Sequence, residues 1–216
     1  KALLKQNRQL DKEAIQAFKN VMSYMGDRSS SKGPIDHAKK MIRNLMISPS
    51  GLRDEVFMQI AKQTNQHPKV DHAIKGWELM AFCLATFLPS RHVKNFLVDY
   101  VSRTLSETST DPRVVTLAKY ALIQLEKIQI SGQRKQIPSV RELDALRETR
   151  KVQIDVPLLN GDVKVLEVDS STTVKQVEDM ITDRMYLIFT EHLGIYVVGG
   201  ANIVRFLEPG ERFLDI

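Results

Sequence analysis

The hydrophobic period of the chain changes near residue 150, and no other feature constrains the fold as strongly. Before this point, apolar residues recur every three or four positions, which is the spacing of one buried face of an α-helix. After it, apolar and polar residues alternate, as they do in a strand with one buried face. The sequence therefore predicts a multi-domain chain, in which an all-α helical bundle (residues 1–150) precedes an α+β lobe (residues 151–216).

The first part should contain six amphipathic helices. Ile15, Phe18, Met22 and Met25 recur at helical spacing and define the expected buried face of the first helix. The fourth helix is apolar around much of its circumference, so it should lie at the centre of the bundle. The connection over 139–151 also looks helical. The apolar positions of the six helices fall within 15–25, 35–46, 52–61, 74–88, 93–101 and 114–128, the last after an Asp-Pro start signal.

The second part has the element order of a ubiquitin-like β-grasp, here without its last strand. Asn160-Gly161 supplies a hairpin turn, and the Ser/Thr run 170–173 should cap the helix that follows. Gly199-Gly200 is interpreted as a second turn. The expected elements are strands over 152–156 and 163–168, a helix over 174–185, and strands over 195–198 and 203–207.

Charge divides the chain at the same place. Residues 1–150 carry a net charge of +10 and residues 151–216 a net charge of −5, within a total of +5. A basic excess of this size favours encounter with acidic partners. Lys39, Lys40 and Arg43 fall within an arc of about 100° opposite the apolar face of the second helix, so we expect them to bind a partner.

A stripe of exposed charge is more often a solvated face than a binding site, and this alternative stays open for Lys39, Lys40 and Arg43. A second stripe is formed by basic residues of the opening segment if that segment is helical. Its members, which fall within about 60°, are Lys1, Lys5, Arg8 and Lys12.

No signature of catalysis is found in the sequence. The chain lacks G-x-x-x-x-G-K-[ST], G-x-S-x-G and H-E-x-x-H, the patterns typical of phosphate binding, serine hydrolysis and zinc proteolysis. We therefore expect no enzyme activity, no cofactor and no metal. Cys83 and Trp77 lie in apolar sequence, and both are interpreted as core residues.

The polar clusters of the helical part are interpreted as structural. His67, Asp71 and His72 lack a second ligand pair at helical spacing, so a solvated loop is favoured over a metal site. Asp54 and Glu55 lie early in the third helix, where carboxylates interact favourably with the helix dipole.

The cysteine content and the length of the apolar runs indicate the cellular compartment of the protein. A single cysteine excludes an intrachain disulfide and favours a reducing compartment. The longest apolar run, 79–88, is about half of the roughly 20 residues that span a bilayer, so membrane contact should be indirect at most. The chain opens in helical sequence without a methionine, and we expect it to be a fragment of a larger, cytoplasmic protein.

Several sequence blocks resemble a known pair of domains. Four blocks lie in the helical part: YMGD at 24–27, LRDEVFMQIAKQT at 52–64, the stretch from GWEL to FLPS at 76–90, and the stretch from GQR to EL at 132–143. Together they resemble the myosin tail homology 4 (MyTH4) domain. The turns at 160–162, 168–170 and 208–212 make the second part similar to the first, ubiquitin-like lobe of a FERM module, which follows MyTH4 domains in myosin tails.

This resemblance implies the cargo- and cytoskeleton-binding tail module of an unconventional myosin motor. Its partners would be proteins: the tails of cargo or adhesion proteins, tubulin in microtubules, or the motor head in an autoinhibited state. The same module in a kinesin or in a non-motor scaffold protein is the close alternative.

Two alternatives of other classes start from the basic residues. A basic helical domain is also suited to nucleic acid, because a phosphate backbone attracts the same cations. Aromatic residues interleaved with Lys and Arg, which mark single-strand binders, are absent, so we expect no nucleic-acid partner. A GTPase-activating domain would need an exposed loop arginine beside a nucleotide, and Arg28 is the candidate for it.

Overall fold

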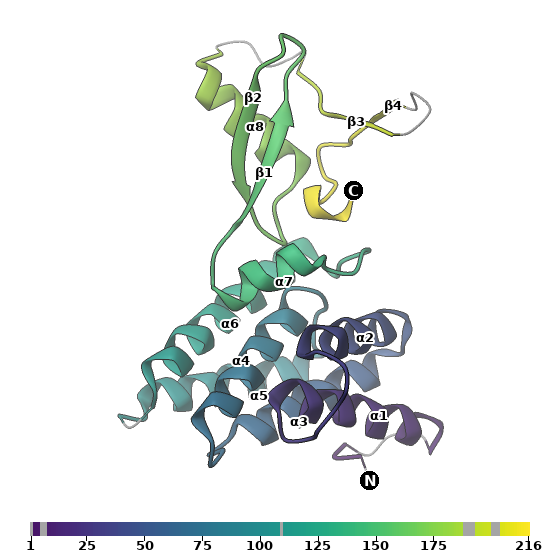
Figure 1. Ribbon diagram of the computed structural model, residues 1–216, viewed down its shortest axis with the longest axis vertical. Coiled ribbons are helices and arrows are strands. Elements are labelled where there is room, and N and C mark those ends of the chain that lie inside the picture. Colours follow the sequence, from purple (N-terminus) through teal and green to yellow (C-terminus); the bar gives the residue numbers. More distant parts are fainter. Residues whose placement is uncertain (1, 5–7, 109, 188–192, 200–203) are drawn as a thin grey trace. The chain divides into compact units, whose positions relative to one another are not determined.

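The computed structural model describes residues 2–4, 8–108, 110–187, 193–199 and 204–216 (Figure 1). The chain divides into two compact units, Lys1–Thr149 and Arg150–Ile216, called the helical unit and the lobe below. Among the helices of the described residues, none is both long and apolar enough to cross a membrane. An all-α unit followed by an α+β unit confirms the fold class expected from the sequence.

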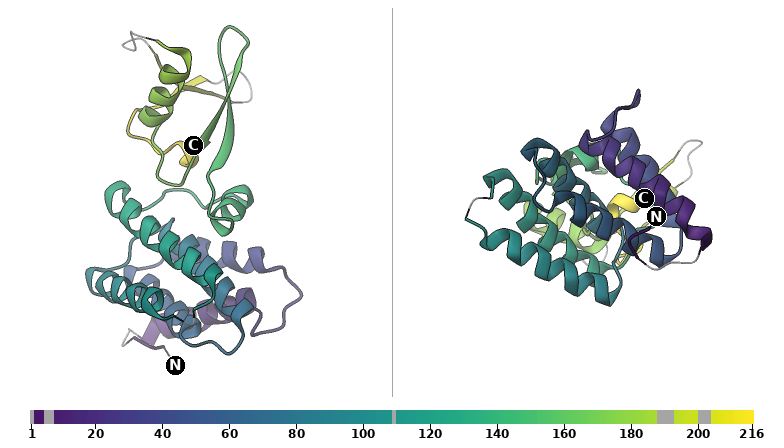
Figure 2. Two further views of the ribbon diagram at one scale, coloured as in Figure 1. Left: turned by 90° about the vertical axis from the view of Figure 1, so that its left-hand side faces the viewer. Right: turned by 90° about the horizontal axis from the view of Figure 1, so that it is seen from below.

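The helical unit consists of the six expected helices and a short seventh in the connection that also looked helical. Helices α1 and α2 lie side by side, and α3 packs against both α1 and α5 (Figures 1 and 2). The helices are α1 (Arg8–Met25), α2 (Pro34–Ile47), α3 (Ser50–Thr64), α4 (Val70–Leu84), α5 (Arg91–Ser106), α6 (Pro112–Ser131) and α7 (Val140–Arg147).

Helix α4 lies at the centre of the helical unit, as its apolar circumference predicted. It packs against α1, α3, α6 and α7, and every residue from 79 to 84 is buried. Trp77 is 1% exposed and stacks on Tyr100 of α5, with ring centroids 5.4 Å apart. Trp77 is therefore a core residue, as predicted. The helix ends at Leu84, earlier than expected, and Leu88 is 38% exposed.

The buried face of α1 differs from the predicted one. Ile15 is 41% exposed, whereas Ala14, Ala17 and Val21 are buried. Met25 of the predicted face is fully buried, so the two faces overlap. Alanine carries a weaker hydrophobic signal than isoleucine, so the sequence pattern shifted the predicted face toward Ile15. The small side chains allow the backbone of α1 to approach its neighbours closely.

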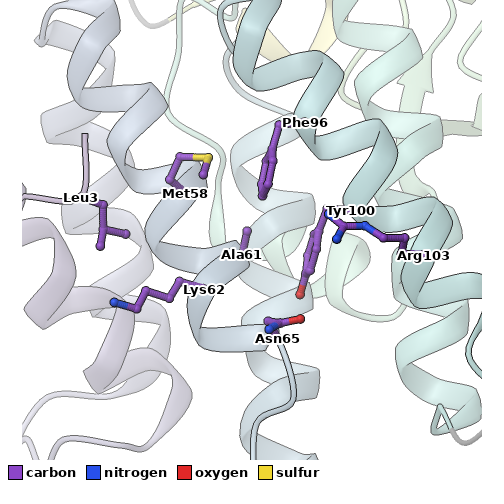
Figure 3. A pocket seen from close by; sticks show the side chains of 8 residues that line it. All are labelled: Leu3, Met58, Ala61, Lys62, Asn65, Phe96, Tyr100 and Arg103. Atoms are coloured by element: carbon purple, nitrogen blue, oxygen red, sulfur yellow. The ribbon is translucent and has the colours of Figure 1, made fainter. Parts of the chain in front are cut away.

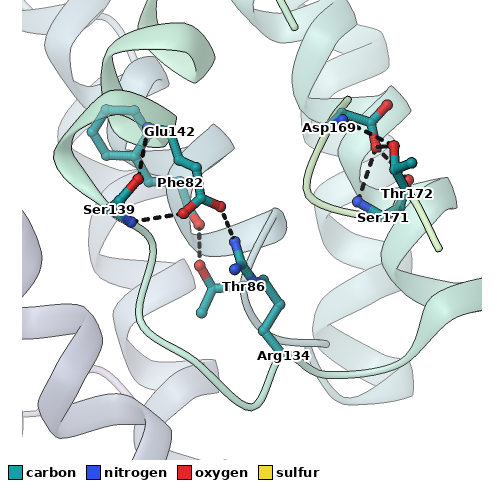
Figure 4. A network of polar contacts seen from close by, with 8 residues as sticks. All are labelled: Phe82, Thr86, Arg134, Ser139, Glu142, Asp169, Ser171 and Thr172. Carbon is teal, nitrogen blue, oxygen red and sulfur yellow. Dashed lines mark hydrogen bonds and ion pairs between the residues drawn. The ribbon is translucent and has the colours of Figure 1, made fainter. Parts of the chain in front are cut away.

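A network of hydrogen bonds and one buried ion pair holds the segment between α6 and α7 against the chain that follows α4 (Figure 4). The Ser139 hydroxyl accepts from the Glu142 backbone N–H, and the Glu142 carboxylate accepts from the Ser139 backbone N–H, which makes a capping box. The same carboxylate pairs with Arg134, whose side chain is fully buried. The Arg134 backbone N–H donates to the Thr86 carbonyl oxygen at 2.9 Å. Glu142 thus joins the start of α7 to the chain that follows α4.

The lobe has the strand, strand, helix, strand, strand order that the sequence predicted. Strands β1 and β2 form an antiparallel hairpin in which Val152 faces Val168, and α8 packs against β2. Gly161 has φ +89°, a conformation that favours glycine in the hairpin turn. Ile203 and Gly200 lie outside the described residues. The elements are β1 (Val152–Pro157), β2 (Val163–Val168), α8 (Val174–Met185), β3 (Tyr196–Val198), β4 (Val204–Phe206) and a 3₁₀ turn at Phe213–Asp215.

Local hydrogen bonds define the start of α8. Thr173 caps the helix through a capping box with Gln176, so the predicted cap is confirmed. In the preceding turn, the Asp169 carboxylate accepts from the Ser171 backbone N–H at 2.9 Å (Figure 4). The buried apolar side chains of the lobe are few among the described residues: Val152, Leu166, Val168, Val174, Val177, Ile181 and Leu207.

Candidate functional site

Helix α2 presents the three basic residues that the sequence selected. Lys40 and Arg43 are exposed and Lys39 is half-buried, while Ala38, Met41 and other residues of the opposite face pack into the core. The part of the chain that the structure describes gives none of the three an ion-pair partner. We call Lys39, Lys40 and Arg43 the α2 basic face. Their charges are available to a partner.

The loop before α2 extends this positive surface, which the sequence pattern alone did not reveal. Arg28 and Lys32 are exposed in this loop, and the Arg28 guanidinium donates to the Ser23 hydroxyl at 3.3 Å. Burial lowers the pKa of His37, and the nearby charges of Arg28, Lys32 and Lys40 lower it further, although Asp36 acts in the opposite direction. Burial is the main cause, and the part of the lowering that comes from the three cations indicates a locally positive potential.

The structure describes only part of the second predicted stripe. Helix α1 begins at Arg8, and the backbone N–H groups of Leu3 and Leu4 donate instead to the Glu55 carboxylate at 2.8 and 2.7 Å. Lys1 and Lys5 lie outside the described residues, and Lys12 is exposed on α1. Residues 2–4 are therefore not helical, and of the four predicted members of the stripe only Arg8 and Lys12 lie in α1 as described.

The paired carboxylates of α3 have a structural role, but not the predicted one. The Glu55 carboxylate, which is fully buried, also accepts from the Gln59 side-chain amide at 2.8 Å. Asp54 accepts from the Ser90 backbone N–H at 2.8 Å, next to the start of α5. Neither lies in the first turn of α3, so the helix-dipole explanation is wrong. They bind backbone donors of segments that are distant in the sequence.

A pocket of about 370 Å³ lies between the opening segment, α3 and α5 (Figure 3). Its walls are largely apolar, with Met58 and Phe96 on facing helices, and the side chains of Lys62 and Arg103 lie at its two ends. Phe96 stacks on Tyr100 with ring centroids 6.0 Å apart. None of these residues was selected from the sequence as part of a binding site, because the pocket arises only when α3 and α5 pack together.

Two histidines that were predicted to lie in a solvated loop are instead nearly enclosed. His72 Nδ1 lies 2.6 Å from Asp27 Oδ1, and His67 Nε2 lies 3.2 Å from Asp27 Oδ2. Burial acts to raise the pKa of Asp27, but hydrogen bonds from His72 and His67 outweigh it and lower that pKa. Asp71 is exposed and pairs with Arg113 at 3.3 Å. The solvated-loop interpretation of the histidines is wrong, and the residue it missed is Asp27.

Cys83 is unsuited to nucleophilic chemistry. It is fully buried in α4, and this burial raises the pKa of its thiol. A thiol that stays protonated is a poor nucleophile and a poor metal ligand. The prediction of inert packing is confirmed for this residue.

Comparison with known proteins gives consistent matches. Residues 39–145 match the MyTH4 domain family. The chain is 28% identical to the Myosin-I heavy chain of Dictyostelium discoideum over 211 residues, which cover 95% of this chain and 9% of that protein. It is 32% identical to the Kinesin-like protein KIN-14I of Oryza sativa subsp. japonica over 176 residues, 80% of this chain and 14% of that protein.

A solved structure is similar over nearly the whole chain. The MyTH4-FERM MF1 domain of Dictyostelium discoideum myosin VII matches 99% of this chain and 44% of its own length, with a TM-score of 0.85 and 26% identity. The similarity therefore includes both the helical unit and the lobe. The chain spans about a tenth of the length of the curated relatives it matches, 9% and 14% in these two cases.

Proposed function

Because the helical unit belongs to the MyTH4 domain family, we propose that this chain is a protein-binding module from the tail of an unconventional myosin and that it is not an enzyme. Domains of this family are binding modules. We assign residues 1–150 to the MyTH4 domain and residues 151–216 to the first FERM lobe. The similarity of the whole chain to a MyTH4-FERM structure supports both assignments.

The tail module would connect a motor to protein partners at the cytoskeleton. Cargo proteins, the tails of adhesion proteins and the motor head are candidate partners, and cytoplasm is the compartment in which they would be met. A kinesin tail is the close alternative, supported by the match to a kinesin-like protein over 80% of this chain. Both alternatives assign the same task to the helical unit, which is to bind another protein.

We assign to the α2 basic face the binding of an acidic filament surface such as the microtubule. The observation that carries this proposal is the exposure of Lys40 and Arg43 beside Lys39, with Arg28 and Lys32 nearby. Cations that lack an internal ion pair keep their full attraction for an anionic lattice, and they accelerate encounter. Exposed pairs each contribute only about 0 to 1 kcal/mol, so no single residue should dominate.

Co-sedimentation with microtubules tests this proposal. The Lys39→Glu, Lys40→Glu, Arg43→Glu variant should bind more weakly by roughly 2 to 4 kcal/mol, about 30- to 900-fold, because repulsion adds to lost attraction. Added salt should weaken the parent in the same direction, because the Debye length is about 8 Å at physiological ionic strength.

A matched control separates the local surface from net charge. Arg91, Lys119 and Arg141 are exposed on α5, α6 and α7, and reversing these three changes the net charge by the same amount. The control variant should pellet with microtubules nearly as the parent does. If the folded α2 variant binds like the parent, the α2 basic face is a solvated surface. If excess duplex DNA displaces the parent from microtubules, the nucleic-acid alternative is favoured instead.

A further inference from the structure

Asp27, His67 and His72 form a compact group of potential metal ligands, which we call the Asp27 cluster. One ligand atom from each residue lies within 4.8 Å of the others. The side chains of Asp27, His67 and His72 are 16%, 10% and 17% exposed, so the group is sheltered but open to a small ion. The three residues come from the end of α1, the loop before α4, and the first turn of α4.

The backbone explains why these segments meet. Gly26 has φ +97°, and the backbone N–H groups of Gly26, Asp27 and Arg28 all donate to the Met22 carbonyl oxygen, so the chain turns sharply at the end of α1. A Cβ atom at Gly26 would lie 3.4 Å from the His72 ring. Such a Cβ would be in ordinary contact with the ring, so it is the left-handed turn that favours glycine here, and Asp27 follows directly.

The hydrogen bonds of His67 suit a metal ligand. His67 Nδ1 accepts from the Lys69 backbone N–H at 3.1 Å in one tautomer and donates to the Lys69 carbonyl oxygen at 3.0 Å in the other. In the first tautomer Nε2–H donates to Asp27, as in the cluster without metal. In the tautomer that donates from Nδ1 to this carbonyl, the lone pair of Nε2 points to Asp27. Metal-bound histidines commonly donate their other N–H to a carbonyl or carboxylate, which fixes the ring and its tautomer.

We propose that Asp27, His67 and His72 bind one divalent transition-metal ion, with Zn²⁺ the best fit, and that water completes the tetrahedron. Two imidazole nitrogens and one carboxylate oxygen form a donor set that Zn²⁺ commonly accepts. Zinc–ligand bonds of about 2.0–2.2 Å in a tetrahedron place ligand atoms about 3.3 Å apart. His72 Nδ1 and His67 Nε2 lie 2.6 and 3.2 Å from different oxygens of Asp27, and one ligand atom from each residue lies within 4.8 Å of the others. Binding of one ion therefore requires the three side chains to rearrange around it.

The hydrogen-bonded cluster without metal is the alternative. In that case the two rings donate to Asp27 and hold the loop before α4 against the end of α1. In the arrangement without metal, ring N–H protons lie between the histidine nitrogens and the Asp27 carboxylate. Zinc binding must release these protons. The metal would link α1 to α4 in the helical unit and would have no catalytic role.

Calorimetric titration of the chelator-treated chain with ZnCl₂ tests the proposal. We expect one Zn²⁺ per chain with a dissociation constant in the micromolar range or tighter. At zinc concentrations of about 100 times this constant, mass action should raise the Tm of the helical unit by roughly 5 to 10 °C. The Asp27→Asn and His72→Gln variants should each weaken binding by roughly 100-fold or more.

His92→Gln is the matched control, because His92 is an exposed histidine on α5, outside the cluster. It should leave the zinc affinity unchanged. A second measurement uses the unaltered chain, so it does not depend on whether a variant folds. Zinc should shift the ring ¹⁵N resonances of His67 Nε2 and His72 Nδ1. Binding weaker than millimolar, ring resonances that do not respond, or equal loss of affinity in His92→Gln would overturn the proposal.

Discussion

The helical unit and the lobe are stabilised in different ways. The helical unit has one continuous core that includes large aromatic side chains such as Trp77, Tyr24 and Phe57. In the lobe, no aromatic residue among those described is buried, and Tyr196 and Phe206 of β3 and β4 are 57% and 41% exposed. A two-stranded hairpin is at best marginally stable by itself. The comparison teaches that side-chain burial holds the helical unit, whereas strand pairing and helix caps have a larger share in the lobe.

Removing one aromatic residue from each unit should give the largest contrast. Trp77→Ala should destabilise the helical unit by about 3 to 5 kcal/mol, because it opens a cavity beside α4 and removes the stack on Tyr100. Tyr196→Ala should cost about 0.5 to 1.5 kcal/mol, since it loses an edge-to-face contact with Phe206 at 5.3 Å on an exposed surface. Urea denaturation, followed by NMR resonances of each unit, measures both values. Equal costs would contradict the comparison.

The two capping boxes provide a contrast between similar local motifs. Glu142→Ala removes a cap and also deprives the buried Arg134 of its carboxylate, so we expect a loss of about 3 to 5 kcal/mol. Gln176→Ala removes the corresponding residue at the start of α8, where we expect about 0.5 to 1 kcal/mol. Chemical denaturation of both variants checks this. Glu126→Ala, at an exposed position of α6, is the control and should be near neutral.

The smallest expected effect is a pH dependence of the stability of the helical unit, which arises from His37. His37 Nδ1 contacts Asn20 Oδ1 at 3.2 Å and its Nε2 contacts the Ser30 hydroxyl at 2.8 Å, a pairing suited to the neutral ring. Because burial lowers the pKa of His37 in the folded state, the unfolded state binds its proton more readily. The stability that the neutral ring provides should be complete above about pH 6.5 and should decrease as pH falls through the lower, folded-state pKa.

An NMR titration of His37 checks this prediction. Its midpoint should lie below about 6.5, the ordinary value for histidine. The His37→Gln variant should lose the part of the acid destabilisation that comes from this ring. A midpoint above the ordinary value would contradict both the burial of the ring and the positive potential around it.

The sequence predicted the helical unit well where large apolar residues carry the pattern. Leu52, Val56 and Ile60 of α3 have clear helical spacing, and all three are buried. The prediction was wrong for the first half of α1, because Ala14 and Ala17 are buried while Ile15 is not. Residue size dominates a periodicity signal, but close helix packing selects small side chains.

The polar sites could not be predicted, because they depend on contacts between distant residues. Asp27 lies 40 positions before His67, and no spacing rule connects a helix end to a loop across that distance. Glu55 accepts hydrogen bonds from the backbone of Leu3 and Leu4, which carries no side-chain signal at all.

The exposure of the α2 basic face was predictable, since it follows from the position of three cations on one helix. Whether that face binds a partner is a property of the surface that sequence periodicity does not determine.

Lysine footprinting on microtubules tests most directly whether the helical unit, and not the lobe, contacts the partner. Acetylation rates of individual lysines, measured by mass spectrometry with and without microtubules, report which surface is covered. We predict that Lys39 and Lys40 lose reactivity on binding, whereas Lys164 and Lys175 of the acidic lobe keep theirs. Unchanged rates at Lys39 and Lys40, or protection confined to the lobe, would contradict the assignment of partner binding to the helical unit.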